Sequence, residues 1–322
     1  NGGRPRTNDC LFDGISVLQP EPGQVAFFPV VEAIQEFKVE VNSPPAEFGR
    51  FNGGVVNLST KSGTNEFHGS AFEFFRNEVL NARNLFAPAT ATNSKKPVFR
   101  RNQFGFVIGG PIIKDRTFFF ADYQGTRRNI GGSVLMRVPT AAERAGDFSA
   151  TNVNIFDPAG NVAPANRAQF DFNGKKNVIP SNRISPQALA LLNKFIPLPN
   201  FTPASPDLPN YVGAGSVKFN EDLTNTRWDY YVSEKMHAFG RYSFADYLLI
   251  SPGVFGSAGG GVGFDPNSTF SGESKTRNQS IASGFDYTLN ANWTTDFRFG
   301  FYRYRVSVDP GQAQTTPAKD AG

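Results

Sequence analysis

The chain has 322 residues and a formal net charge of only +4, and its Lys and Arg are scattered along the sequence. A basic groove for nucleic acid is therefore not expected. Aromatic residues make up 14% of the chain, with 33 Phe, and 32 Gly with 23 Pro leave little room for long helices, so strands should dominate. The single cysteine, Cys10, excludes an internal disulfide and a metal site built from several cysteines.

Residues 1–66 predict short strands joined by turns. Residues 36–41 alternate between apolar and polar side chains, which is typical of a half-buried strand. Pro44 and the proline after it end that strand, and residues 55–60 predict a second one. The Asp-Gly pair that begins at Asp13 predicts a turn near the start of the region.

From residue 68 onward the chain predicts longer strands, whose connections run long, short, very long, short, long and short. One helix is predicted inside the very long connection, at residues 185–195, because Ser185 can cap it and Pro197 ends it. The seven predicted strands cover residues 68–80, 102–112, 117–127, 223–232, 236–247, 272–289 and 293–306.

The alternation of short and long connections indicates which kind of sheet these strands form. Bacterial outer-membrane barrels have short periplasmic turns and long extracellular loops, whereas a soluble sandwich has no reason to keep its long loops at one end. The chain has no run of about 18 apolar residues, so no transmembrane helix is predicted. We therefore predict an all-β fold, with about seven strands of a partial antiparallel transmembrane β-barrel in the cell outer membrane. A large soluble all-β protein, in which aromatic residues alternate for the same packing reason, is the alternative at this point.

Both ends of the sequence predict a piece of a longer protein. The chain begins at Asn1 without a Met or a signal peptide and stops at Gly322 in a polar stretch. Seven strands with two open edges cannot close, so we expect the barrel to continue beyond Gly322.

Several strings in one order resemble the TonB-dependent outer-membrane receptors, and in particular their Oar-like branch. Residues 51–65 (FNGGVVNLSTKSGTN) resemble the end of the plug domain of these receptors. The other matching strings are residues 36–39 and 46–49 in the plug, 68–77 in the first barrel strand, 102–105, 109–111 and 118–123 in the next hairpin, and 144–149, 179–180 and 183–185 in the first long loop.

The resemblance implies a C-terminal part of a plug domain at residues 1–66 and an N-terminal part of a barrel at residues 67–322, with a long extracellular loop at residues 128–222. It implies a complete barrel of about 22 strands. A TonB-type inner-membrane energy-coupling complex, reached through a segment that precedes this chain, would pull on the plug and let a substrate pass. Outer-membrane lipid and an unknown extracellular substrate are the other partners it implies. One departure is the NSPP sequence at residues 42–45, where many family members have Arg-Gly-Pro, so we expect no salt bridge from that arginine.

Two sets of site residues are predicted. The plug turn is expected to contact the ligand through Glu47, Arg50 and Asn52, because an arginine can meet an anionic substrate; an ordinary solvated turn is the alternative. Charged residues on strands are costly in lipid, so they are expected to face the lumen and to pair with the plug. The expected plug–barrel contacts are Lys61, Glu73, Arg227 and Arg241, and the other lumen-facing charges are Asp229, Asp286, Asp296 and Arg298.

Catalytic and metal sites have little support in the sequence. His68 and His237 are the only histidines, and neither has a nearby nucleophile and carboxylate in a recognisable pattern. The spacing of Asp147, Asp157 and Asp171 matches no calcium loop. We therefore expect no enzyme activity, no metal and no cofactor.

Three functions remain open at this point. Energised uptake by a receptor-transporter is the leading hypothesis. A surface-contact or adhesive barrel and a protein-export barrel, both without energised uptake, are the alternatives. The coupling segment that would distinguish them lies outside the sequence, and so does any indication of the substrate.

Overall fold

The computed structural model describes residues 8–19, 25, 28–41, 48, 53–83, 85, 96–159, 163–256, 263–264, 271–311, 316 and 319. The chain forms two compact units. Unit 1 comprises Asn1–Asn129, Lys218–Leu249 and Ser274–Ser307, and unit 2 comprises Ile130–Val217, Ile250–Glu273 and Val308–Gly322. No helix in the described residues is long and apolar enough to cross a membrane.

A small sheet of four strands forms the N-terminal part of unit 1, in the order β2-β1-β4-β3. β1 pairs with β4 in parallel, and the other neighbours are antiparallel. β3 and β4 confirm the two strands predicted here, whereas β1 was not predicted, because its four residues are all buried and do not alternate. The elements are β1 (Asp9–Phe12), β2 (Ile15–Ser16), the 3-10 helix Val31–Ala33, β3 (Ile34–Glu40) and β4 (Val55–Thr60).

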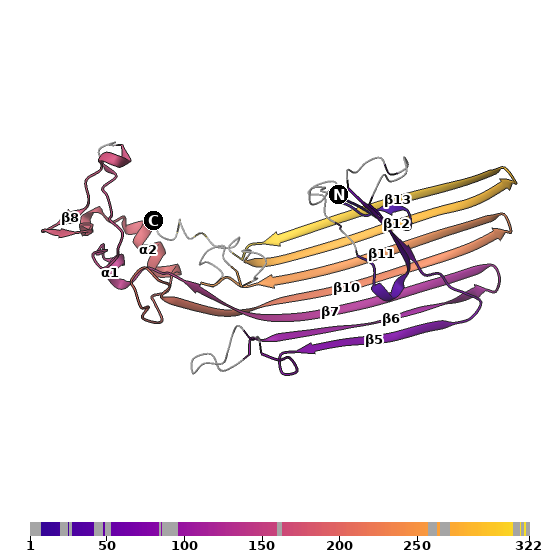
Figure 1. Ribbon diagram of the computed structural model, residues 1–322, viewed down its shortest axis with the longest axis horizontal. Coiled ribbons are helices and arrows are strands. Elements are labelled where there is room, and N and C mark those ends of the chain that lie inside the picture. The colour runs from indigo at the N-terminus through magenta and orange to yellow at the C-terminus, as the bar shows by residue number, and fades with distance from the viewer. Residues whose placement is uncertain are drawn as a thin grey trace. The chain divides into compact units, whose positions relative to one another are not determined.

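A large sheet of seven strands confirms the predicted barrel strands, in the order β13-β12-β11-β10-β7-β6-β5. The short connections β6–β7, β10–β11 and β12–β13 all lie at one end of these strands (Figure 1). β7 and β10 include nine and twelve residues more of the segment 128–222 than predicted. The strands are β5 (His68–Asn77), β6 (Phe99–Ile113), β7 (Thr117–Met136), β10 (Tyr211–Ser233), β11 (Met236–Ser251), β12 (Gly272–Asn290) and β13 (Trp293–Asp309).

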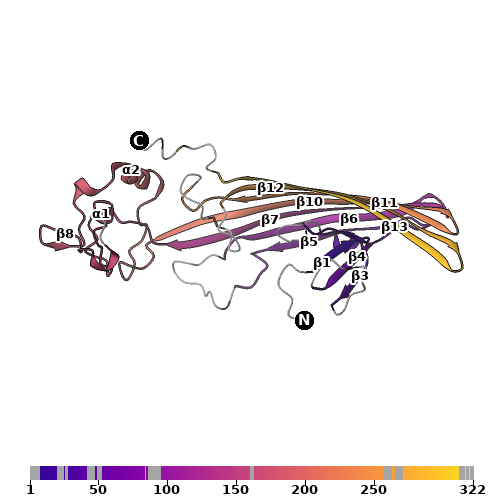
Figure 2. The same ribbon diagram turned by 90° about the horizontal axis from the view of Figure 1, so that it is seen from above.

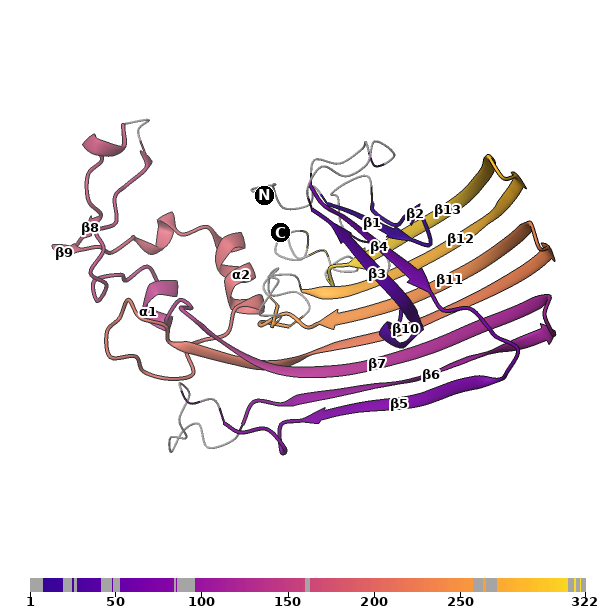
Figure 3. The ribbon, with the colours of Figure 1, turned by 45° about the vertical axis from the view of Figure 1, so that its right-hand side comes forward.

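The two faces of the large sheet differ in chemistry. Within unit 1 the small sheet lies against one face, here called the inner face (Figures 2 and 3). The opposite or outer face carries large apolar side chains at alternate positions, such as Phe297, Phe299 and Phe301, which are 53%, 53% and 56% exposed. Because side chains alternate along a strand with period two, each strand supplies both faces.

An apolar core joins the small sheet to the inner face. Cys10, Phe12 and Val17 belong to one buried cluster with residues from four strands of the large sheet. Gly300 on β13 permits a close approach, since a β-carbon there would lie 2.3 Å from the Ile15 side chain. The residues from the large sheet in this cluster are Val107, Phe120, Leu223 and Ala245.

Unit 2 contains the predicted helix as α2 (Pro186–Phe195). The Ser185 hydroxyl accepts from the backbone N–H of Ala188 at 3.3 Å and caps the helix as predicted. Arg144 closes the other end, because its guanidinium donates to the carbonyl oxygens of Leu192 and Ile196. The remaining elements are α1 (Ala141–Arg144), β8 (Asp171–Phe172), β9 (Lys175–Lys176) and the 3-10 helices Pro164–Asn166 and Ser181–Arg183.

Two ion pairs in unit 2 predict a loss of local stability in acid. The Arg183 guanidinium, 2.5 Å away, holds the pKa of Asp157 down to about 2, and the Lys175 ammonium lowers the pKa of Asp147. A carboxyl group whose pKa is lowered on folding stabilises the folded state at pH values above its unfolded pKa of about 4. That stabilisation is lost as the pH falls toward about 2. Amide protection over residues 147–183, measured by hydrogen exchange and corrected for intrinsic rates, should therefore be constant from pH 7 to 5 and fall below pH 4. Protection unchanged at pH 2 would contradict the role of these pairs.

Cys10 provides a reporter for the position of the small sheet. Its thiol is 7% exposed, and burial, with a smaller contribution from Asp9, raises its pKa to about 11. Since the thiolate is the reactive species, maleimide should label Cys10 at least about a hundred-fold more slowly at pH 8 in the folded protein than in urea. Peptide mass spectrometry measures this rate, and equal rates in both states would show that the small sheet is not docked.

Candidate functional site

The turn between β1 and β2 brings the carboxylate of Asp13 against the inner face. Asp13 has a left-handed backbone with φ of 51°, and Gly14 continues the turn with φ of 79°, which glycine adopts without strain. Thr60, at the end of β4, holds the carboxylate: its backbone N–H and its hydroxyl donate to Asp13 Oδ1 at 2.8 and 3.0 Å. Because the Asp13 side chain is only 5% exposed, its charge requires partners within the protein.

Two arginines of the large sheet are those partners. Nη1 of Arg241 on β11 lies 2.6 Å from Asp13 Oδ2, and Nη1 of Arg227 on β10 lies 3.1 Å from Oδ1. Arg241 is fully buried, and its guanidinium stacks 3.7 Å from the centroid of the Phe12 ring. Within the described part of the chain, Nε and Nη2 of Arg241 have no hydrogen-bond partner. The charge of Arg241 therefore depends on Asp13 for its compensation.

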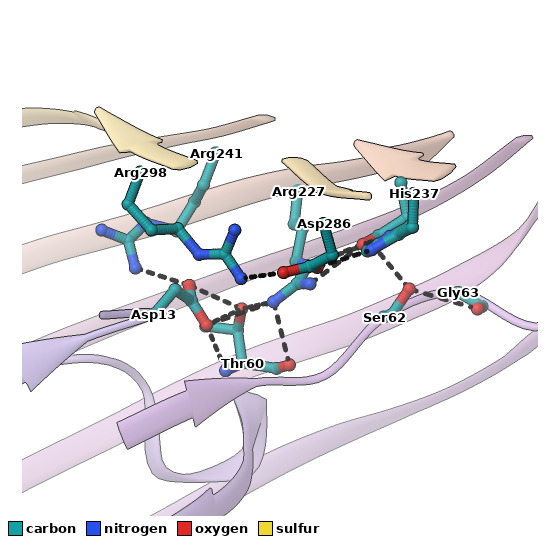
Figure 4. A network of polar contacts seen from close by, with 10 residues as sticks. Asp13, Thr60, Ser62, Gly63, Arg227, His237, Arg241, Asp286 and Arg298 are labelled. Atoms are coloured by element: carbon teal, nitrogen blue, oxygen red, sulfur yellow. Dashed lines mark hydrogen bonds and ion pairs between the residues drawn. The ribbon is translucent and has the colours of Figure 1, made fainter. Parts of the chain in front are cut away.

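The network continues from Arg227 toward the end of the small sheet (Figure 4). Nε and Nη2 of Arg227 donate to Asp229 at 3.0 and 2.9 Å. Asp229 also accepts from the Ser62 hydroxyl at 2.7 Å and lies 3.0 Å from Nε2 of His237. Since Ser62 lies two residues after the end of β4, the small sheet is attached to the inner face at a second point.

Beyond His237 the charges alternate in sign across β12 and β13. Nδ1 of His237 is 3.5 Å from Asp286, which accepts from Nη2 of Arg298 at 2.7 Å. Arg298 also pairs with Asp296 at 2.7 Å, and its guanidinium lies 5.0 Å from the centroid of the Phe239 ring. The network therefore links all four strands from β10 to β13 and reaches the small sheet at Asp13 and Ser62.

An open cavity of about 690 Å³ adjoins this network. Its polar lining can offer both charged donors and charged acceptors to a ligand. In the residues that the structure describes, no group of three or more His, Cys, Asp or Glu is placed to hold a metal ion. The lining includes Asp9, Asp13, Phe48, Asn57, Thr60, Arg227, His237, Asp286, Asp296 and Arg298.

The arrangement is suited to holding and binding rather than to nucleophilic chemistry. The Ser62 hydroxyl donates to the Asp229 carboxylate, whereas an activated nucleophile needs a base such as imidazole within hydrogen-bond reach. His237 lies between two carboxylates, of Asp229 and Asp286. Its ring therefore bridges two anions in the network.

The structure places the predicted site residues in different surroundings. Arg227 and Arg241 both contact the small sheet, but their partner is Asp13. Lys61 remains within the small sheet, where its Nζ donates to the carbonyl of Glu32 at 2.7 Å. The predicted ligand contacts, Glu47, Arg50 and Asn52, lie outside the described residues.

Glu73 differs from the expectation that it faces the lumen. It pairs with Phe104 of β6 in the antiparallel register, so both side chains lie on the same face. Gln103, next to Phe104, donates to Gln124 of β7 at 2.8 Å. Gln124 lies on the inner face, because Asp122 two residues before it accepts from Asn225. Asn225 lies on the same face of β10 as Arg227. The register therefore places Glu73 on the outer face, because a shift of one residue exchanges the two faces.

Asp13, Thr60, Ser62 and His237 are contacts that the sequence analysis did not identify. The Asp-Gly signal gave the turn at Asp13 but not the direction of its carboxylate. Asp13 and Arg241 are separated by 228 residues, and no local pattern connects positions so distant. Among the described residues, Asp13 shares its positive φ with Asp115, Asn173 and Asn177, so this local feature does not single it out either.

The fold and a comparison with known families together define the class of protein. The family model of the outer membrane beta barrel domain matches residues 59–322. The chain belongs to this family, and the outer membrane is its location, as predicted. The large sheet forms an unclosed part of such a barrel.

The relatives confirm the resemblance to TonB-dependent receptors of the Oar-like branch. The chain is 34% identical over 125 residues to the TonB-dependent transporter Oar of Myxococcus xanthus, an alignment that covers 38% of this chain and 12% of Oar. The outer membrane transporter YddB of Escherichia coli has a similar fold, with a TM-score of 0.51 and 13% identity over 94% of this chain. The chain spans 32% of the length of YddB.

Removal of the Asp13 charge should release the small sheet. Asp13→Asn leaves the buried guanidinium of Arg241 without an anion, and loss of one partner of a buried pair costs about 3–5 kcal/mol. We expect faster maleimide labelling of Cys10 in the full-length protein and a lower temperature of unfolding.

The matched control is Glu40→Gln in the same sheet. Glu40 pairs with Lys38, and their side chains are 18% and 69% exposed. Because the Lys38 ammonium is open to solvent, the pair contributes about 0–1 kcal/mol. Labelling of Cys10 in this variant should equal that of the wild type. If Asp13→Asn also left the labelling unchanged, the network would not hold the sheet.

Proposed function

We propose that the chain is part of a TonB-dependent transporter that takes up a substrate with energy from the inner membrane. In this proposal residues 1–66 are the C-terminal part of the plug, residues 67–322 are the first part of the barrel, and the loop 128–222 is extracellular. The similarity to Oar and the membership of the barrel family support it. The observation that supports the proposal most strongly is that the small sheet contacts the inner face through Asp13.

The direction of pull follows from the order of the strands. A coupling segment would precede residue 1, so force would enter the described part of the chain at β1. β1 pairs in parallel with β4 from Asp9 to Phe12, and the turn at Asp13 comes next. Tension on β1 would therefore load the contacts of Asp13, including those with Thr60, before the contact of Ser62 with Asp229, because a short segment ties Ser62 to β5.

Ion pairs suit an attachment that must be broken and formed again. When the pairs of Asp13 separate, water can solvate each charge, so a partly opened state is less costly in a wet lumen than in a dry core. The apolar part of the attachment is a cluster of nine buried residues in the described part of the chain, among them Cys10, Phe12 and Val17. A plug held in this way could leave the wall without unfolding the barrel.

The substrate contacts belong to the same proposal. We place them at Glu47, Arg50 and Asn52, because Phe48, within this turn, lines the open cavity. Arg50→Ala should weaken binding of an anionic substrate by roughly ten-fold or more, as expected for loss of a charge-assisted hydrogen bond. Unchanged binding would remove Arg50 from the site.

Energised movement of the plug is tested directly by Cys10. The full-length protein is labelled with a small maleimide in cells of its own bacterium, grown in their own conditioned medium, with and without a protonophore. We expect labelling of Cys10 to be several-fold faster in energised cells. The Glu40→Gln protein serves as the control, and it should respond to the protonophore as the wild type does.

Equal labelling with and without the protonophore would overturn energised uptake. That outcome would favour a surface-contact or export barrel whose small sheet stays in place. Slow labelling in both conditions would still agree with the Asp13 network, so the two claims are separated by this measurement.

A further inference from the structure

On β7 and β10–β13 the outer face changes sharply from apolar to charged along the strand, whereas β5 carries Glu73 on this face. Counted from the short turns, β7 and β10–β13 carry no charged side chain on this face over roughly the first ten residues of each strand. The first charged outward residues are Arg127 on β7, Asp222 on β10, Asp246 on β11, Arg277 on β12 and Arg303 on β13. We call these five residues, together with Arg305, the outer charged belt.

The position of the belt matches one surface of a membrane. Ten to thirteen residues separate its members from the short turns, which at about 3.3 Å per residue and a tilt of about 45° is roughly 23–30 Å along the membrane normal. The apolar band of an outer-membrane barrel is about 25 Å tall, and its short turns are periplasmic. The belt therefore lies at the level of the headgroups of the outer leaflet.

Two arginines of the belt lie opposite each other on neighbouring strands. The stacked rings of Phe285 and Phe297, with centroids 5.5 Å apart, align β12 with β13. Eight residues farther along each strand, this alignment brings Arg277 opposite Arg305, on the same outer face. Like charges directly opposite each other destabilise a sheet, so an anion bound between these two arginines would stabilise it.

The chain itself supplies little negative charge there. Arg277 pairs with Asp246 at 3.0 Å, in an exposed contact. Arg303 and Arg305 are exposed, and within the described part of the chain no ion pair compensates either of them. Farther along the belt Arg127 is neutralised by Asp222 at 2.8 Å, which leaves the excess positive charge on β12 and β13.

We propose that Arg277, Arg303 and Arg305 form a binding site for the phosphate groups of an anionic glycolipid in the outer leaflet. The guanidinium forks suit phosphate oxygens, with which they form paired hydrogen bonds. The apolar band directly below, with Phe299 and Phe301 exposed, provides the surface for the acyl chains of the same molecule. This inference depends on the outer-membrane location and is independent of energised uptake.

The test uses the full-length protein in detergent with lipid A as the probe, and native mass spectrometry measures the bound fraction. Arg303→Gln with Arg305→Gln should weaken binding by about five-fold for each arginine, or roughly twenty-five-fold together, at low salt. Heat-modifiable migration in gels shows that each variant is folded. The control is Arg116→Gln, because Arg116 lies at the opposite end of the strands against the ring of Tyr230, and it should bind as the wild type does.

Two further arms identify what the site recognises. Lipid A without its phosphates should bind at least ten-fold more weakly to the wild type, and millimolar inorganic phosphate should not displace intact lipid A. The proposal is wrong if the double variant retains wild-type binding or if the phosphate-free lipid binds equally well. Displacement by inorganic phosphate alone would replace it with a site for free anions.

Discussion

The carboxylate of Asp13 compensates the buried guanidinium of Arg241 and also pairs with Arg227, and the position of the small sheet depends on this contact. Arg241 is fully buried and has two nitrogen atoms without partners in the described part of the chain. Its charge makes any displacement of Asp13 costly until water can enter. The left-handed turn at Asp13 is what aims the carboxylate at β10 and β11. The ion pairs thus fix the position at which the small sheet docks on the inner face. The apolar cluster around Phe12 adds buried area but does not favour one position over another.

The period of two along each strand explains why one sheet can have two such different faces. On β13, Arg298 enters the inner network, while Phe297 and Phe299 on either side lie on the outer face. The same alternation on β10 separates Arg227 from Trp228. A wall of this kind offers polar partners to the small sheet and apolar surface to lipid from a single stretch of sequence.

Much of this arrangement was predictable because it is local. The alternation of apolar and polar residues predicted the strands, and the lengths of the connections predicted that the short turns lie at one end. The cost of placing a charge in lipid predicted that Arg227 and Arg241 point to the inner face. Asp13 was not predictable as their partner, because its contact with Arg241 joins residues 228 positions apart. Glu73 does not follow the expectation that charged strand residues face the lumen, because its register with Phe104 fixes its side chain on the outer face. An acidic residue is less costly than a basic one on the lipid side.

The coupling energy between Asp13 and Arg241 tests the central claim most directly. A double-mutant cycle with Asp13→Ala and Arg241→Met, read out by the labelling rate of Cys10 in the full-length protein, measures how far each residue acts through the other. The ion pair predicts that the double variant is no looser than Asp13→Ala alone, with a coupling energy of at least about 2 kcal/mol. Additive effects, with coupling below about 0.5 kcal/mol, would mean that the small sheet is held by other contacts.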